Sequence, residues 1–320
     1  MLRKFSTKTL FIAFLILMAL VVTSKLVDHH KGNRTFKGEL VAYQADRINR
    51  IIIHPQAMNG QQLEIVKKKS NQWFVEVNGN TFHADKSLTE SIINSLNHLK
   101  PTRIASTQSK KWKNYQLTDS MATHLQLYNG TQLKADIRTG KTSSNQQRMI
   151  TYIRMAGDPT VYGVNDDELS DFNRKANGYK SKMIIESAQD KWDQLTFTYP
   201  ADSSFTLRKT GTQWRLEAMP ADSSRIASYL SSIEHVRHYK LANTVPSGDP
   251  AFSLKIEGAQ LNQSIVLNGY LEGRNFILGS SQNPGVYFMG NDLHSKFFVN
   301  QRHFVPKEKS KSRKSKISKQ

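Results

Sequence analysis

Apolar and polar residues alternate over most of the chain, which is the period of strands with one buried face. Two alternating stretches match each other. Residues 63–77 and 205–217 each contain an alternating segment, a polar turn and a second alternating segment that opens with Gln-Trp, at Trp73 and Trp214. This pattern predicts a β-hairpin in each copy, with its tryptophan on the buried face.

A segment with helical periodicity follows each hairpin. The first helix is expected to begin after Asp85, where Ser87 and Glu90 have the spacing of a capping box. The second is expected to begin at Asp222. The faces that they are expected to bury consist of Ile92, Ile93, Leu96 and Leu99 in the first helix, and of Ile226, Tyr229, Leu230, Ile233 and Val236 in the second.

Further matches between the two halves come after these helices. They pair residues 124–130 with 253–258, 152–164 with 276–289, and 167–172 with 291–297, and they align Tyr162 with Tyr287. The matches predict an internal repeat. We therefore expect an α+β protein with two related lobes of mostly antiparallel sheet, each with one long helix, over residues 40–180 and 190–305. Residues 177–191 are expected to connect the lobes.

An apolar run precedes both lobes. Residues 10–22 are apolar without interruption and follow Arg3, Lys4 and Lys8, which is typical of a targeting signal. We favour an uncleaved signal-anchor over residues 1–27, forming an N-terminal transmembrane helix, followed by a polar stalk over residues 28–39. A cleaved secretory peptide and a soluble core helix are the alternatives. The expected anchor residues are Leu10, Phe11, Ile12, Phe14, Leu15, Ile16, Leu17, Leu20, Val21 and Val22.

The positive charge of the chain is unevenly distributed. Its formal net charge is +19, of which the segment from Lys307 onward carries +6 and the residues between the termini about +10. Such a run is typical of a disordered tail, here residues 306–320. The tail could also attach to an anionic lipid or polymer, and its candidate anion contacts are Lys311, Arg313, Lys314 and Lys316.

A second basic segment interleaves cations with aromatic residues. Trp112 and Tyr115 stand beside Lys110, Lys111 and Lys113. Such a segment could contact a nucleic acid or a lipid headgroup. An ordinary amphipathic loop is the favoured interpretation.

The residues offer little for catalysis or metal binding. The chain has no cysteine, which excludes disulfides, thiolate metal sites and cysteine nucleophiles. The ten histidines lack metal-site spacing, and His235 and His238 are interpreted as cations at the end of the second helix. Glycine-rich phosphate loops and a nucleophile elbow are absent. The densest acidic group is interpreted as helix capping and consists of Asp158, Asp166, Asp167, Glu168 and Asp171.

The order of these features resembles a known family. The features are an N-terminal apolar segment, a Gln-Trp hairpin, a helix, residues 112–122, Leu125 and Leu127, and finally Val161-Tyr162. The chain resembles the bacterial domain of unknown function 4340 in the order of these features. Gln116 stands where a glycine is common. The resemblance implies one N-terminal segment in the bacterial inner membrane and an extracytoplasmic body. Some members are encoded near gliding-type transport components, which implies an accessory role in the envelope. The family supplies no catalytic residues.

We therefore expect a non-catalytic, membrane-anchored envelope protein that acts as a scaffold or accessory subunit of a transport or surface-assembly complex. Sheet edges and loops would hold its protein partner. The alternatives are a module that binds an anionic polymer or lipid through the basic tail, and a hydrolase that uses a cleft between the lobes. No catalytic, cofactor-binding or metal residue is assigned, no cofactor or small-molecule substrate is expected, and nucleic acid is not expected as a partner.

Overall fold

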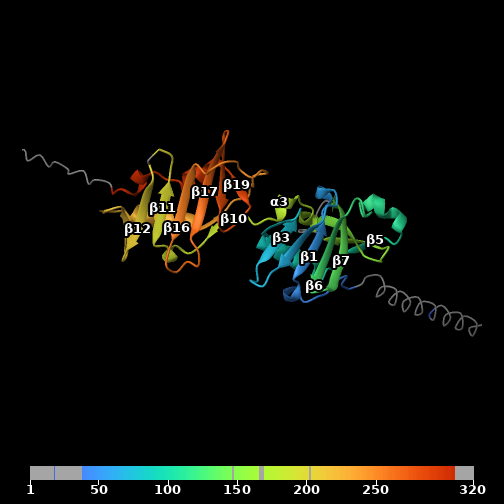
Figure 1. Cartoon of the computed structure of the whole chain (residues 1–320). Helices are drawn as coiled ribbons and strands as arrows, with labels where there is room; N and C mark the ends of the chain where they lie inside the picture. The colour runs from blue at the N-terminus through green and yellow to red at the C-terminus, as the bar shows by residue number, and fades with distance from the viewer. Residues whose placement is uncertain (1–17, 19–37, 146–147, 166–168, 202, 307–320) are drawn as a thin grey trace, which may run out of the picture. The chain divides into compact units, whose positions relative to one another are not determined.

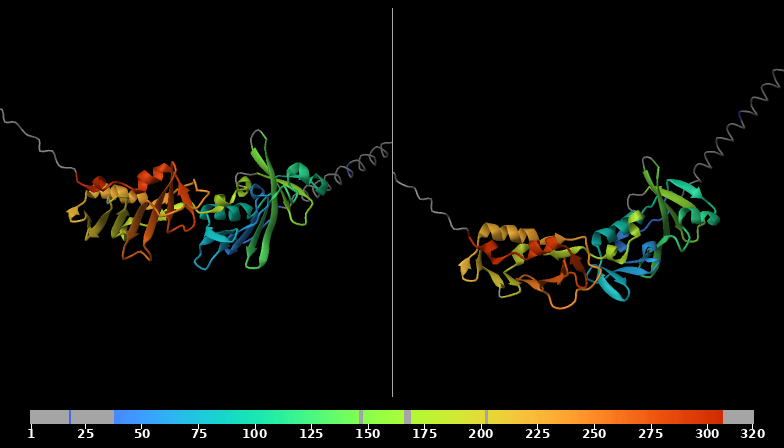
Figure 2. Two further views of the ribbon diagram at one scale, coloured as in Figure 1. Left: turned by 45° about the horizontal axis from the view of Figure 1, so that its top comes forward. Right: turned by 90° about the horizontal axis from the view of Figure 1, so that it is seen from above.

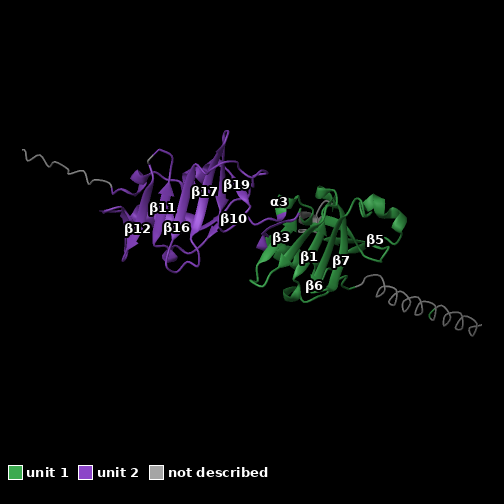
Figure 3. Cartoon of the chain, viewed as in Figure 1, with its two compact units in different colours: residues 1–78, 87–178 green, residues 79–86, 179–320 purple. Residues whose placement is uncertain are grey.

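The computed structural model describes Met18 and residues 38–306, except residues 146–147, 166–168 and 202. The chain divides into two compact units, the first of residues 1–78 and 87–178 and the second of residues 79–86 and 179–320 (Figure 3). Both consist mainly of antiparallel sheet with a few helices, so the expected α+β class and the two large sheets are confirmed (Figure 1).

The predicted anchor over residues 10–22 and the basic tail from Lys307 onward lie outside the described residues, apart from Met18. Within the described part of the chain, no helix combines the length and the apolar character needed to cross a bilayer.

The first sheet has nine strands in the order β4-β3-β2-β1-β6-β7-β8-β9-β5. Strands β2, β3 and β6 bury alternating residues, β1 and β9 bury consecutive residues, and helix α2 (Lys86–Leu96) buries Ile92, Ile93 and Leu96. The strands are β1 (Arg50–His54), β2 (Leu63–Lys67), β3 (Trp73–Val77), β4 (Asn80–His83), β5 (Arg103–Ser106), β6 (Thr123–Asn129), β7 (Gln132–Asn145), β8 (Arg148–Met155) and β9 (Val161–Asn165).

The second sheet has eight strands in the order β14-β13-β12-β11-β16-β17-β18-β19. Helix α4 (Ser223–Ile233) covers one face of it, and a separate pair of strands, β10 (Met183–Glu186) and β15 (His235–Arg237), adds to the same core (Figure 2). The eight strands are β11 (Gln194–Thr198), β12 (Phe205–Thr210), β13 (Gln213–Leu216), β14 (Met219–Pro220), β16 (Phe252–Glu257), β17 (Ile265–Glu272), β18 (Asn275–Ser280) and β19 (Tyr287–Met289).

Short helices connect the strands. In the first unit they are η1 (Ala45–Arg47), η2 (Gln56–Met58), η3 (Ser109–Tyr115), η4 (Leu169–Phe172) and, next to the unit boundary, α3 (Ala176–Tyr179). In the second unit they are η5 (Gln189–Lys191), α5 (Asn291–Phe297) and η6 (Gln301–Phe304).

Both sheets connect their strands in the same order. Strands β3-β2-β1-β6-β7-β8-β9 have the counterparts β13-β12-β11-β16-β17-β18-β19. The registers agree as well. Ile51 lies opposite Ile65, as Leu195 lies opposite Leu207. Trp73 and Trp214 both lie opposite a lysine in their hairpins, but Trp73 is buried whereas Trp214 is half-buried.

The ends of the two long helices differ from the prediction. Helix α4 begins as expected, and the side chain of its N-cap residue Asp222 accepts a hydrogen bond from the backbone N–H of Arg225. Helix α2 begins at Lys86, so Ser87 lies inside its first turn and is not the cap. Leu99 and Val236 are buried beyond the helix ends, where Leu99 forms a β-bridge with Val41 and Val236 belongs to β15.

Two further expectations are corrected by strand pairing. Residues 177–191, which were expected to connect the lobes, contain strand β10, and its Ile184 and Ile185 are fully buried in the core of the second unit. The strand pairing also shows that the sequence match of Tyr162 with Tyr287 is wrong by one residue. Ile153 lies opposite Tyr162, and its counterpart Leu278 lies opposite Phe288, so Tyr287 takes the position of Val161.

Residues 107–122 connect β5 to β6, contain η3 and are here called the η3 segment, which lies on the solvent-facing side of the first sheet. Leu117 is fully buried there together with Tyr152 and Val161, and Trp112 packs against this small cluster. Gly140 lets the η3 segment lie close to strand β7. A Cβ atom at this position would lie 2.1 Å from the carbonyl oxygen of Tyr115. The segment therefore covers a face that the alternating pattern alone would leave in water.

We predict that Gly140→Ala destabilises the first unit. The added methyl group overlaps a backbone oxygen that cannot move without detaching the segment, and overpacking of this kind costs about 1–3 kcal/mol. Denaturant unfolding of the full chain measures the effect. Gly38→Ala is the control, since a Cβ at Gly38 meets no atom within 4 Å. Equal stability of the two variants would contradict the prediction.

Candidate functional site

A row of basic side chains crosses the solvent-facing side of the first sheet. His54, His124, Arg138 and Arg154 lie directly opposite one another on β1, β6, β7 and β8. The rings of His54 and His124 are stacked, with their centroids 5.5 Å apart. Like charges that lie opposite each other across strands repel. The row therefore depends on counter-charges from its neighbours.

Two carboxylates supply these counter-charges. Asp136 Oδ1 lies 2.8 Å from His124 Nε2 and 3.2 Å from Arg138 Nη1. Asp119 Oδ1 accepts hydrogen bonds from Arg138 Nε at 2.8 Å and from Arg154 Nη2 at 2.6 Å. The row and its two carboxylates thus form one connected network.

The pKa of Asp136 reflects this network. Burial alone would raise the pKa of its carboxyl group, but the opposing interactions outweigh burial and hold the pKa below its ordinary value. These are hydrogen bonds from His124 and Gln126, the latter at 2.7 Å, together with the charges of His124 and Arg138. Asp136 is therefore ionised at neutral pH.

Arg154 links the network to the η3 segment. Its side chain is only 5% exposed, and its Nε donates a hydrogen bond of 2.8 Å to the carbonyl oxygen of Leu117. Its guanidinium carbon lies 3.9 Å from the centre of the Trp112 ring, and Trp112 Nε1 donates to the carbonyl oxygen of Pro159. Burial and the charge of Arg138 lower the pKa of Arg154, against the opposing effect of Asp119. Its Nε and Nη2 groups both bond within the first unit and its guanidinium group lies against the Trp112 ring, so we interpret this network as structural.

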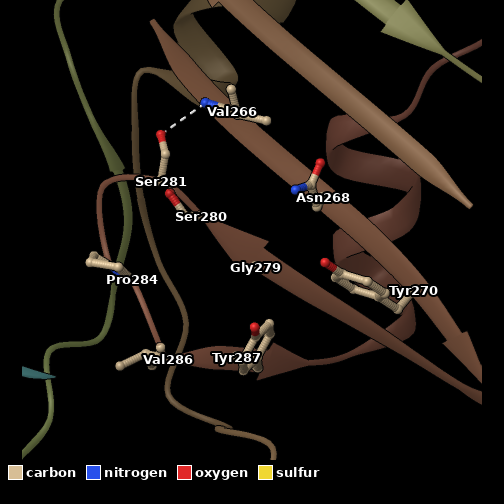
Figure 4. A pocket seen from close by; sticks show the side chains of 10 residues that line it. Val266, Asn268, Tyr270, Gly279, Ser280, Ser281, Pro284, Val286 and Tyr287 are labelled. Atoms are coloured by element: carbon tan, nitrogen blue, oxygen red, sulfur yellow. Dashed lines mark hydrogen bonds between the residues drawn. The ribbon is translucent and has the colours of Figure 1, made fainter. Parts of the chain in front are cut away.

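The second sheet has an open hollow on its solvent-facing side. It has a volume of about 250 Å³ and lies over β17, β18, β19 and the loop before β19 (Figure 4). Tyr270 and Tyr287 stand on either side of Gly279, with their ring centroids 6.2 Å apart and nearly perpendicular. Its lining consists of Val266, Asn268, Tyr270, Gly279, Ser280, Ser281, Pro284, Gly285, Val286 and Tyr287.

The hollow offers aromatic surface and hydrogen-bonding groups side by side. Burial, followed by the neighbouring Tyr287, raises the pKa of Tyr270, so its hydroxyl group keeps its proton at neutral pH. Asn268 and Ser281 add polar atoms from β17 and the end of β18, although Ser281 Oγ already accepts from the backbone N–H of Val266. Such a surface suits a ligand with one apolar and one polar side.

The hollow occupies the place that the η3 segment fills in the first unit. The register makes Asn268 the counterpart of Arg138 and Gly279 the counterpart of Arg154. Tyr287 is the counterpart of Val161, which lies beneath Leu117 in the first unit. In the second unit, Leu241 takes the place of β5 and forms a β-bridge with Phe288. Residues 243–251, which follow it, contain no helical turn and do not line the hollow, so this face stays open.

Several residues proposed from the sequence take roles other than those expected. Lys110, Lys111 and Lys113 are exposed on η3, whereas Trp112 and Tyr115 are half-buried. His235 follows the C-cap of α4 at Glu234 and is the first residue of β15, whereas His238 lies directly after β15. His238 Nε2 lies 3.0 Å from the carbonyl oxygen of Met289. Among the described residues, no three His, Asp or Glu side chains could hold a metal ion together.

The acidic group and the anion contacts lie mostly outside the described residues. Of the acidic group, the side chain of Asp158 is described, and it accepts a 2.8 Å hydrogen bond from the Tyr162 hydroxyl. Asp166, Asp167, Glu168 and the side chain of Asp171 lie outside the described part, as do the anchor residues and Lys311, Arg313, Lys314 and Lys316.

Sequence reasoning missed the tyrosine hollow. Tyr287 was matched to Tyr162 on the identity of their Val-Tyr pairs, but Tyr162 is buried and Tyr287 is half-buried. The signal that identifies it is the alternation of burial over residues 286–289, in which Val286 and Phe288 are buried and Tyr287 and Met289 are half-buried.

We predict that Asp136→Asn lowers the free energy of unfolding by about 1.5–3 kcal/mol at pH 7, the usual contribution of hydrogen bonds to a charged group. A carboxylate with a lowered pKa stabilises the fold above its ordinary pKa near 4, and this stabilisation is lost as the pH falls through the folded-state value. The difference from the wild type should therefore shrink below about pH 4.

Denaturant unfolding at neutral and acidic pH tests this prediction. Asp46→Asn, which changes an exposed carboxylate of the same unit, is the control and should have little effect at either pH. A difference between Asp136→Asn and the wild type that persists unchanged at about pH 2.5, well below the ordinary carboxyl pKa, would contradict it.

Comparison with known proteins identifies one family. The family model described as Domain of unknown function (DUF4340) matches residues 73–254, more than half of the chain. The match begins in β3 and ends in β16, so it includes the η3 segment and the basic row from His124 onward but not the tyrosine hollow. No curated protein and no solved structure matches the chain. On the length of the family match, the chain belongs to the DUF4340 family.

Proposed function

We propose that this chain is a non-catalytic, membrane-anchored envelope protein that holds a protein partner on the open face of β17, β18 and β19. It would act as a scaffold or accessory subunit of a transport or surface-assembly complex, with both units outside the inner membrane. The proposal treats the two units as related copies, one with this face covered by its own chain and one with the face open.

The observation that carries the proposal is the hollow between Tyr270 and Tyr287. In the first unit, the corresponding face is filled by the η3 segment, in which Leu117 is buried and the half-buried Trp112 of the helical turn packs against the same cluster. The same framework can therefore receive a short helical segment. A partner segment of this kind, with an aromatic or large apolar side chain, would cover the two tyrosine rings and hydrogen-bond to their hydroxyl groups and to Asn268.

The chemistry of the hollow favours a protein over a small molecule. Its volume of about 250 Å³ lies below the range of about 300–1,000 Å³ typical of small-molecule sites. Tyrosine is enriched where proteins bind one another, because its ring contributes contact area and its hydroxyl group a hydrogen bond. The face continues onto β16, where Lys255 lies opposite Val266 and is exposed, which gives a partner room to spread.

The edges of the second sheet are less suited to docking than its open face. Strand β14 at one edge consists of Met219 and Pro220, and proline cannot donate to an added strand. At the other edge, the backbone N–H of Ala242 donates to the carbonyl oxygen of Tyr287, so the chain itself covers β19. The expected docking through sheet edges is therefore replaced in this proposal by docking on the face.

The proposed location rests on the sequence ahead of the units. The uninterrupted apolar residues 10–22, preceded by Arg3, Lys4 and Lys8, suit a signal-anchor that inserts with its N-terminus inside. An anchor of this kind would carry the units across the inner membrane and keep them near its surface.

Site-specific photo-crosslinking in intact cells tests the proposal. With the photoreactive amino acid at Pro284, on the exposed lip of the hollow, we predict one discrete adduct with another protein. Tyr270→Ser together with Tyr287→Ser should lower its yield at least about tenfold, because central aromatic residues dominate binding at interfaces. Immunoblotting and mass spectrometry measure the adduct.

Tyr239→Ser is the matched control, because Tyr239 is 74% exposed in the same unit but does not line the hollow. This variant should leave the adduct unchanged. An adduct that survives the double substitution, or the absence of a protein adduct, would refute the proposed docking face.

A further inference from the structure

Most of the positive charge between the termini is concentrated in one stretch of the first unit. Residues 100–155 contain ten Lys and Arg but only two carboxylates, Asp119 and Asp136, a net charge of +8 out of the +10 between the termini. The stretch spans four strands and the η3 segment, so the fold decides which of these charges lie together.

Both carboxylates are already engaged. Asp136 contacts His124 and Arg138, and Asp119 contacts Arg138 and Arg154. Six cations of the stretch form no ion pair with any carboxylate of the described residues; one of them, Lys134, instead donates to Gln132 Oε1, and the other five lie on or beside η3. These five constitute the η3 basic cluster, namely Arg103, Lys110, Lys111, Lys113 and Lys141.

Aromatic contacts gather the cluster on one surface. The rings of Tyr115 and Tyr152 lie 4.7 Å apart. The Nζ atom of Lys141 lies 5.6 Å from the centre of the Tyr115 ring, and the guanidinium carbon of Arg103 lies 5.3 Å from that of Tyr152, whose hydroxyl group accepts from Arg103. The three lysines of η3 are exposed on the helical turn that ends at Tyr115.

The cluster stands on a rigid support. Its helical turn is held from below by the contact between Arg154 and the Trp112 ring, by the hydrogen bond from Trp112 to Pro159 and by the close approach to Gly140. A fixed set of cations loses less conformational entropy on binding than the same charges on a disordered tail. This distinguishes the cluster from an ordinary solvated charge run.

We infer that the η3 basic cluster binds the phosphate headgroups of an anionic membrane surface. The choice of a membrane rests on the anchor of the proposed function. Only fifteen residues separate Val22 at the end of the apolar run from Gly38, where the described first unit begins, so an extended linker reaches at most about 55 Å. An anchored first unit is thus held near the headgroups, where each cation strengthens binding to an anionic surface about fivefold.

The absence of cysteine allows a direct test on the full chain, because a single introduced cysteine takes a fluorescent label at one site. Asn114, exposed between Lys113 and Tyr115, is replaced by Cys and labelled with an environment-sensitive dye. The probes are vesicles of phosphatidylcholine alone and vesicles with about one third phosphatidylglycerol. We predict a blue shift of the dye with the anionic vesicles that disappears when the salt concentration rises to about 0.5 M.

Two triple variants of equal net charge distinguish binding by the cluster from attraction by the net charge of the whole chain. Lys110→Glu, Lys111→Glu and Lys113→Glu together should reduce the dye response at least about tenfold. The control variant replaces the exposed residues Lys69, Lys191 and Lys240 by Glu, which changes the net charge by the same amount. It should keep most of the dye response. An equal loss in both triple variants, or a response to soluble polyphosphate but not to anionic vesicles, would overturn the inference.

Vesicle flotation distinguishes this result from a failure of the anchor. A chain with an inserted apolar run floats with both kinds of vesicle, whatever their charge. Failure to float with phosphatidylcholine vesicles would refute the anchor while the dye still reports on the cluster. Flotation without a dye response would refute the cluster and leave the anchor intact.

Discussion

The buried guanidinium of Arg154 determines how the first unit covers its sheet. Burying a charge is costly unless each polar group finds a partner. Arg154 finds its partners in the carbonyl oxygen of Leu117, the carboxylate of Asp119 and the face of the Trp112 ring. All three belong to the η3 segment. The need to satisfy one charge therefore fixes that segment on the sheet, and with it the orientation of the exposed lysines.

The second unit shows what the same framework does without this charge. Gly279 stands at the position of Arg154, and Asn268 at that of Arg138. Neither can hold a covering segment by charge. The hollow at this place is instead bordered by Tyr270 and Tyr287. Their hydroxyl groups can hydrogen-bond to water, and their rings can pack against a ligand. One framework thus yields a closed charged face in one unit and an open aromatic face in the other, which is why we propose different ligands for them.

Local signals in the sequence predicted the elements that local interactions determine. The alternation in β2, β6 and β16 and the N-cap of α4 at Asp222 follow from residues a few positions apart, and the structure confirms them. The helix ends were predicted less well. Leu99 and Val236 continue the apolar period of their helices, but the chain has already left the helix and buries them through strand pairing. The apolar period predicts that a residue is buried, but it does not predict whether a helix or a strand buries it.

The tyrosine hollow was missed for a related reason. A shift of one residue along a strand exchanges its two faces. In β9 the four residues from Val161 to Val164 are all buried, because the η3 segment covers the outer face, so this strand carries no visible alternation. In β19 the outer face is open and alternation returns. Matching Tyr162 to Tyr287 by identity compared a strand buried on both sides with one that is open on one side. Residues 286–289 are all apolar, so the open face appears in their burial pattern and not in the sequence.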